Sequence, residues 1–214
     1  MKGIILKDLY ENFYIKKNLA SYIFGLGFVT LMFVAISAEY TFVLYVMLIS
    51  ILFGSCMLEA SYEQDEKANF YKLQFTFPVT KTEVVLAKYL LALASTSVSA
   101  LLALAYSLFH IWRYRIITLP EALTVWGLSI CVSLIFTSVV YLFYFLFGKK
   151  IGIVLYVLCA AILGGIYGAS SAIFGIDRLI GMDPVLLCVY FPVSIALFAL
   201  SCLLSAQIYK RRYS

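Results

Sequence analysis

Six long apolar stretches, separated by short polar gaps, fill most of this chain after its first 18 residues. They cover residues 19–38, 40–58, 86–112, 122–147, 151–175 and 185–208. A helix needs about 20 apolar residues to cross a bilayer core of roughly 30 Å, and each stretch is about that long or longer. Because charged residues make up only 13% of the chain, the sequence predicts an all-α integral membrane protein with six transmembrane helices.

The first two stretches lie so close together that they resemble one helix. From residue 19 to 58 only Glu39 is charged, yet a straight helix of that length would reach roughly 58 Å. Since that is about twice the hydrocarbon thickness, we expect a hairpin with a tight turn near 37–40. A count of four or five spans is the alternative, because the glycine-rich segment 164–168 weakens the fifth stretch.

The basic residues fall in alternate gaps between these stretches. One group comprises Lys2, Lys7, Lys16, Lys17, Lys67, Lys72, Lys81, Lys88, Lys149, Lys150, Lys210, Arg211 and Arg212. Only Arg113, Arg115 and Arg178 remain for the other side. Basic loops stay in the cytoplasm, so we expect a protein of the inner (plasma) membrane with both termini cytoplasmic. The net charge of +5 then reflects this topology and attraction to anionic lipids, with no nucleic-acid partner.

The first 18 residues carry apolar and charged side chains on opposite faces of a helix. The apolar face holds Ile5, Leu6, Leu9 and Phe13, and the charged face holds Lys7, Asp8 and Glu11. This pattern favours an amphipathic interfacial helix on the inner membrane surface. An ordinary soluble lead-in is the alternative.

Residue types that carry chemistry are scattered along the chain. The five cysteines lie singly in apolar stretches, and the one histidine, His110, has no Cys, Asp or Glu at ligand spacing. No histidine or carboxylate adjoins the span serines Ser95, Ser97, Ser99, Ser129, Ser133 and Ser138. Serines in spans commonly pack helices together or bond a neighbouring backbone. We therefore expect a protein that is not an enzyme and has no metal site.

Two further absences concern the source of energy. The phosphate-binding motif G-x-x-x-x-G-K-[ST] does not occur in the sequence, so the chain has no P-loop for nucleotide phosphates. Ionisable residues are found only near the ends of the apolar stretches. Ion-coupled carriers retain such residues at membrane depth. If the protein transports a substrate, we expect its energy to come from another polypeptide.

The longest polar gap, residues 59–88, begins with a helix-start signal. Ser61 followed by Gln64 is a capping-box pattern. The charges that match a helix dipole are Glu63, Asp65 and Glu66 early, and Lys67 and Lys72 late. Pro78 would end such a helix. We therefore expect a short cytoplasmic helix within residues 61–76.

A second capping-box pattern, Thr80 with Glu83, follows in the same gap. It predicts a helix over about 81–112, roughly 47 Å long, that protrudes from the inner face. The far half of the preceding short helix carries Phe70, Tyr71, Leu73, Phe75 and Phe77. Such rings either anchor a loop at the headgroup level or dock a cytoplasmic partner, and composition favours neither reading.

The same gap resembles the signature of short bacterial type-2 ABC exporter permeases. Their pattern is approximately acid-acid-Lys, apolar and aromatic residues, and then LPVSRxEIVxxKY. Here the acid-acid-Lys is at 65–67 and the string FPVTKTEVVLAKY at 77–89. Phe77 replaces Leu, and Thr-Lys at 80–81 replaces Ser-Arg. The Leu-Lys-Asp-Leu opening at 6–9, the length and the span count are also similar to the family.

The resemblance implies an ATP-driven exporter. Two permease subunits, this chain with a second copy or a close homologue, would form a dimer in the bilayer. Two separate ABC ATPase subunits would bind ATP and Mg and dock below. The helix between the second and third spans would be the coupling helix, held by the ATPase, with the N-terminal helix as an accessory contact. Its docking residues would be Tyr62, Glu63, Asp65, Glu66, Lys67, Phe70, Tyr71 and Lys72.

The family includes exporters of phenol-soluble modulins and of peptide antibiotics, which implies an amphipathic peptide or lipid-like cargo. Residues 1–214 would then form one permease domain. Its parts are the interfacial helix 1–18, the first two spans 19–58, the coupling helix 61–76, and the remaining spans with a basic tail, 81–214. The residues alone fit a second reading equally well, a non-transporting membrane scaffold or sensor module that docks a cytoplasmic partner.

Overall fold

The computed structural model describes residues 2–68, 70, 79–175 and 180–212, except for the side chains of Glu66, Phe174 and Arg212. The described part of the chain is all-helical. Its helices are α1 (Lys2–Phe13), α2 (Lys16–Val34), α3 (Glu39–Lys67), α5 (Lys81–Tyr114), α6 (Leu119–Phe147), α7 (Lys149–Phe174) and α9 (Val185–Arg212).

Six of these helices, all except α1, are long and apolar enough to cross a membrane. The predicted hairpin is confirmed, because α2 ends at Val34 and α3 begins at Glu39. The alternative of four or five spans is wrong, since α7 continues without a break through its glycines at 164–168. In the interior of a helix the cost of a glycine is only about 1 kcal/mol, which an apolar helix of this length tolerates.

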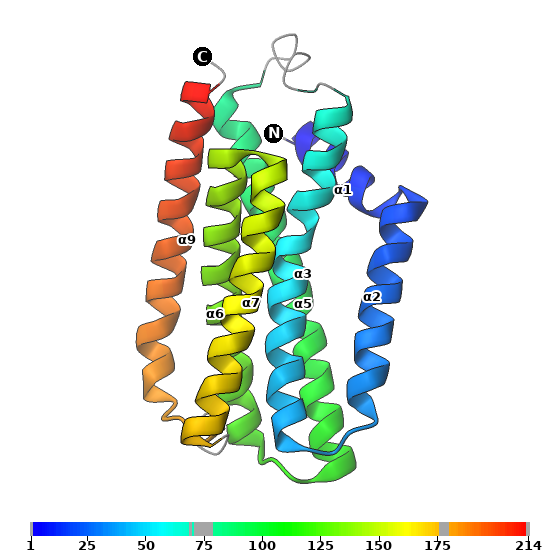
Figure 1. Cartoon of the computed structure of the whole chain (residues 1–214), viewed down its shortest axis with the longest axis vertical. Helices are drawn as coiled ribbons and strands as arrows, with labels where there is room; N and C mark the ends of the chain where they lie inside the picture. Colours follow the sequence, from blue (N-terminus) through cyan, green and yellow to red (C-terminus); the bar gives the residue numbers. More distant parts are fainter. Residues whose placement is uncertain (1, 69, 71–78, 176–179, 213–214) are drawn as a thin grey trace.

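The spans run side by side, and α1 and the last turns of α9 lie at the same end of the bundle (Figure 1). We call this the basic end, because α1, the last turn of α3, the first turns of α5 and α7 and the end of α9 bring most of the lysines there. The opposite end, which holds the turns 35–38 and 115–118, is called the far end. Helices α3, α5 and α6 form the centre, and α9 packs on α6 and α5.

Small residues allow the central helices to approach closely. A Cβ atom at Gly54 of α3 would lie 2.8 Å from Ser133 Oγ and 3.0 Å from Thr96 Oγ1. Ser133 Oγ donates to the carbonyl of Ser50 at 2.6 Å, and Ser95 Oγ donates to the carbonyl of Gly54 at 3.1 Å. The expectation that span serines bond neighbouring helices is confirmed for both serines, and these bonds tie α3 to α5 and α6.

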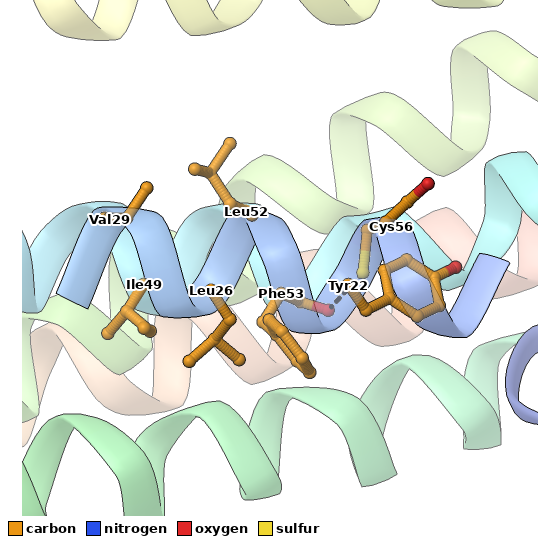
Figure 2. Close-up of a pocket in the computed structure, with 9 residues that line it drawn as sticks. Tyr22, Leu26, Val29, Ile49, Leu52, Phe53 and Cys56 are labelled. Atoms are coloured by element: carbon orange, nitrogen blue, oxygen red, sulfur yellow. Dashed lines mark hydrogen bonds between the residues drawn. The ribbon is translucent and has the colours of Figure 1, made fainter. Parts of the chain in front are cut away.

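Helix α2 lies at the edge of the bundle and has no buried residue. Between its inner half and α3 there is an apolar groove of about 180 Å³ (Figure 2). Tyr22 and Leu26 of α2 face Leu52 and Phe53 of α3 across it. The groove is partly open to the surface of the bundle.

The sequence signal at Ser61 was misleading, because no helix begins there. Helix α3 runs unbroken from Glu39 to Lys67, and Ser61 is a buried residue within it. Its hydroxyl accepts a hydrogen bond from Asn12 Nδ2 at 3.2 Å instead of capping a helix. The stretch around it is rich in Ala, Glu, Gln and Lys, which are strong helix formers. The helix of the second span therefore continues past the residue at which a separate short helix was predicted to begin.

The second cap is confirmed. Helix α5 begins at Lys81, directly after Thr80, and both halves of the capping box are formed. Thr80 N donates to Glu83 Oε2 at 2.9 Å, and Glu83 N donates to Thr80 Oγ1 at 3.3 Å. The helix then extends to Tyr114, close to the predicted end.

Candidate functional site

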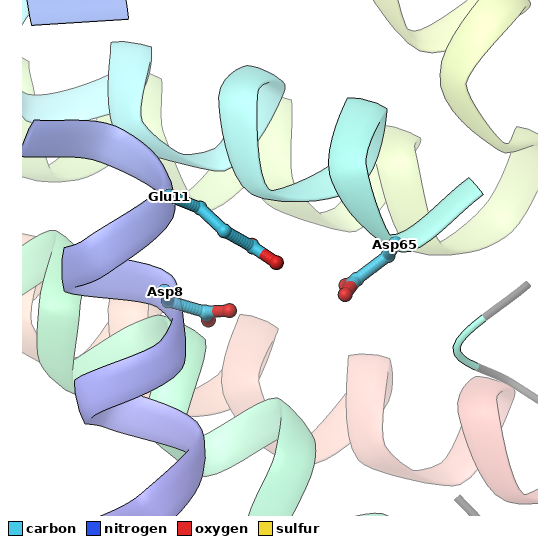
Figure 3. Close-up of side chains that lie close together, drawn as sticks. All are labelled: Asp8, Glu11 and Asp65. Carbon is cyan, nitrogen blue, oxygen red and sulfur yellow. The ribbon is translucent and has the colours of Figure 1, made fainter. Parts of the chain in front are cut away.

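Charged side chains from three helices meet inside the basic end, and Figure 3 shows the three acidic ones, from α1 and α3. We call them the charge cluster: Lys7, Asp8 and Glu11 of α1, Asp65 of α3 and Lys88 of α5. These positions are up to 81 residues apart, so only the fold brings them together. The cluster joins the N-terminal helix to the end of the second span and to the start of the third.

Lys88 is the most deeply placed cation of the cluster. Its side chain is 4% exposed, and Nζ lies 2.8 Å from Asp65 Oδ2 and 3.5 Å from Asp8 Oδ2. An isolated buried ammonium is very unfavourable, and the two carboxylates compensate it. Their arrangement holds all three helices at one point.

Lys7 supplies the second positive charge. Its Nζ contacts Asp65 and lies 3.2 Å from Asp8 Oδ1 and 3.5 Å from Glu11 Oε1. It also lies 4.0 Å from the ring centroid of Phe70, a cation–π distance. The three carboxylates are spaced like metal ligands, within 4.8 Å of one another. However, the two lysines already contact their oxygens, so the chain supplies its own cations.

Neutral polar groups extend the cluster towards α2. Asn12 Nδ2 donates to Ser61 Oγ of α3, and Asn12 Oδ1 accepts from the hydroxyl of Tyr22 at 2.7 Å. Asn18 Nδ2 of α2 donates to the carbonyl of Glu11 at 2.8 Å. Through these bonds α1 is connected to α2 as well as to α3 and α5.

Helix α1 turns its polar face towards the protein. Its buried residues are Ile4, Asp8 and Asn12, whereas Leu6, Tyr10 and Phe13 are 66%, 56% and 38% exposed. The sequence correctly separated an apolar from a charged face, but the charged side meets the charge cluster instead of water. Of the predicted apolar face, Leu6 and Phe13 are exposed and Ile5 and Leu9 are half-buried. Polar contacts therefore supply much of the attachment of α1 to the bundle.

The residues predicted to dock a partner have different environments. The ring of Tyr62 packs against those of Tyr144 and Phe145, with centroids 5.6 and 5.7 Å away. Glu63 lies 2.6 Å from Lys67 and 3.6 Å from Lys149 of α7. Tyr62 and Glu63 therefore both contact other residues of this chain.

The remaining docking residues and the predicted cap residue Gln64 differ in how far the structure places them, and the side chain of Glu66 is not among those described. Asp65 is already paired with two lysines, and Lys67, with a side chain 62% exposed, points outward. Gln64 is half-buried near the end of α3. Tyr71 and Lys72 lie outside the described residues.

Sequence reasoning did not identify the charge cluster as a site. Its members were seen separately, as the charged face of an amphipathic helix and as parts of the permease-like signature. The permease-like signature was the signal that could have revealed the cluster. Its acid Asp65 and its lysine Lys88 are in direct contact in the structure. The opening Lys7 and Asp8 join the same contact.

Comparison with known proteins gives one family. The family model described as "ABC-2 family transporter protein" matches residues 3–210, nearly the whole chain. No curated protein and no solved structure matches the sequence or the fold.

Proposed function

The chain belongs to the ABC-2 family of transporter proteins, and on that premise we propose that it is the membrane half of an ATP-driven exporter. It is a transport subunit and not an enzyme. The sequence has no P-loop, so ATP and Mg would be bound by separate ATPase subunits, two per assembly. The family match over residues 3–210 is the observation that carries this proposal.

We place the ATPase at the basic end, on the cytoplasmic side. Lysines and arginines mark the inner side of a membrane protein, and they gather at this end of the bundle. The contact surface would begin at the exposed last turn of α3, with Lys67 and Ala68. Asp65 would contribute inside the chain and not at the contact surface, because its carboxylate is paired with Lys7 and Lys88. A push on the end of α3 would reach α1 and α5 through that pairing.

We propose an amphipathic or hydrophobic cargo, either a peptide or a lipid-like molecule. The groove between α2 and α3 supports this class, since its lining is almost wholly apolar and it is partly open (Figure 2). The hydroxyl of Tyr22 lies at the same groove and is bonded to Asn12. A molecule in the groove would therefore touch a residue connected to the charge cluster.

A second copy of this chain or a close homologue would complete the pathway. Two helices contribute few side chains to the core, namely α2, with no buried residue, and α7. Helix α7 exposes apolar side chains along its length, such as Val154, Val157 and Ile166. A partner subunit would cover part of these faces and lipid would cover the rest.

Cross-linking tests the proposed docking surface. On a cysteine-free background, Ala68→Cys should form a cross-link with the ATPase that co-purifies with the tagged chain, because this residue is exposed at the end of α3. Leu119→Cys, which is 52% exposed at the far end, is the matched control and should give no cross-link. The products are identified by mass spectrometry.

A cross-link from position 119 in place of 68 would contradict the proposed orientation. Transport by the same assembly in proteoliposomes distinguishes the exporter from the scaffold or sensor alternative. A scaffold would bind its partner at Ala68→Cys, but ATP would then drive no movement of an amphipathic peptide across proteoliposomes.

A further inference from the structure

The charge cluster contains one carboxylate more than its two ammonium groups can neutralise. Lys7 and Lys88 face Asp8, Glu11 and Asp65, and the three acids lie within 4.8 Å of one another. Asp8 and Asp65 each contact both lysines, whereas Glu11 has only the 3.5 Å contact with Lys7. If all five groups are ionised, the cluster has a net charge of −1 in a largely buried site, and Glu11 is the acid with the weakest pairing.

The second oxygen of Glu11 identifies where a proton would go. Among the described residues, no hydrogen-bond partner reaches its buried Oε2, while the whole side chain is only 13% exposed. A buried, unpaired carboxylate oxygen carries a large desolvation cost. Protonation of Glu11 replaces a buried charge with a neutral group, whose burial costs less, and makes the cluster neutral.

Among the described residues, four charged groups face Glu11. From its own helix it faces Lys7 and Asp8, from α3 it faces Asp65, and from α5 it faces Lys88. Its contact with α2 is neutral, because the side-chain amide of Asn18 donates to the backbone carbonyl of Glu11. Burial raises the pKa of Glu11 to about 7, with the neighbouring carboxylates acting in the same direction and Lys7 opposing them.

The attachment of α1 depends on this charge balance. Two of its three buried residues, Asp8 and Asn12, are polar, and Ile4 is the one apolar side chain of α1 that is buried. Few apolar contacts would therefore hold α1 if the cluster were strained. An exposed apolar face also gives α1 an alternative resting place at the membrane surface.

We propose that Glu11 is a proton-binding site that controls whether α1 stays docked on α3 and α5. With a proton on Glu11 the cluster is neutral and α1 is held. Without it, one uncompensated buried carboxylate favours release of α1 onto the bilayer surface. The pairing of Asp65 with Lys88 does not require α1, so α3 and α5 remain joined when α1 leaves.

The direction of the pH effect follows from linkage. A carboxyl that binds its proton more tightly in the docked state favours docking most strongly at low pH. Docking weakens as pH rises from about 4.5, the ordinary pKa of a glutamate, to about 7, the pKa of Glu11 in the docked state. Above that pH it is constant. Between pH 5.5 and 7.5 the ratio of docked to released α1 should fall on the order of 20-fold.

Hydrogen exchange of the purified full chain in lipid nanodiscs measures this ratio. The protection of α1 amides, expressed relative to the intrinsic chemical rate at each pH, should decrease over that range, while the protection of α6 amides stays constant. Glu11→Gln has no ionisable group and should keep α1 protected at both pH values. Glu11→Asp retains a carboxyl and should retain the pH dependence, and Glu59→Gln, at an exposed position of α3, should behave as the parent.

Constant protection of α1 in the parent would overturn the proposal, and so would an unreduced pH dependence in Glu11→Gln. A fall in protection that α6 shares would also overturn it, because the whole bundle would then be opening. The measurement needs no ATPase and no cargo. Its failure would therefore leave the proposed exporter function untouched.

Discussion

Replacing Lys88 with glutamine should destabilise the chain by about 3–5 kcal/mol, the cost of breaking a buried ion pair from one side. The side chain of Lys88 is 4% exposed and compensates Asp65 and Asp8. Without it, Lys7 alone faces three carboxylates. Thermal unfolding of the purified chain, followed by tryptophan fluorescence in detergent, measures the loss.

Two further variants separate this effect from loss of a lysine in general. Lys150→Gln removes an exposed lysine at the same end and should change stability by less than about 0.5 kcal/mol. The pair Lys88→Gln with Asp65→Asn removes one charge of each sign and should recover part of the loss. If Lys88→Gln is as stable as the parent, the cluster does not hold the helices together.

Gly54→Leu should destabilise the centre of the bundle by about 1–3 kcal/mol or more. Any Cβ at this position meets Ser133 Oγ at 2.8 Å and Thr96 Oγ1 at 3.0 Å, and a leucine side chain is much larger than a Cβ. It would push α3 away from α5 and α6 and break the bond from Ser95 to the carbonyl of Gly54. Thermal unfolding and the yield of folded protein both report this loss.

Gly164→Leu is the matched control for that substitution. It is the same glycine-to-leucine substitution in another apolar helix, but a Cβ atom at Gly164 meets nothing within 4 Å. Leucine also has the higher helix propensity, so the control should be as stable as the parent or slightly more stable. Equal losses at both positions would show that close packing at Gly54 is not what joins the central helices.

The span pattern could be predicted from the sequence because it depends on length and apolarity. The six stretches and the hairpin turn follow from the thickness of the bilayer. The cap at Thr80 was also predictable, since both partners of the box lie within four residues. A local signal of this kind predicts the structure correctly when no residue far away in the sequence bonds to the same groups.

Distant contacts explain what the sequence could not predict. Ser61 has the local signature of a cap, but its hydroxyl is used by Asn12, 49 residues earlier. The charged face of α1 looked solvent-facing because its partners, Asp65 and Lys88, lie on other helices. Asp65 likewise looked like a residue that meets a partner protein, although its carboxylate is paired within the chain.

The most direct test of the account compares ATP hydrolysis in three samples: the purified chain, the ATPase that co-purifies with it, and the two reassembled in proteoliposomes. The chain alone should show no hydrolysis, and the reassembled complex should hydrolyse ATP at a rate that rises when an amphipathic peptide cargo is added. Lys88→Gln should abolish that rise, because the ion pair that links the end of α3 to the start of α5 is lost. Hydrolysis by the chain alone, or an ATPase whose rate is the same with and without the chain, would contradict the account.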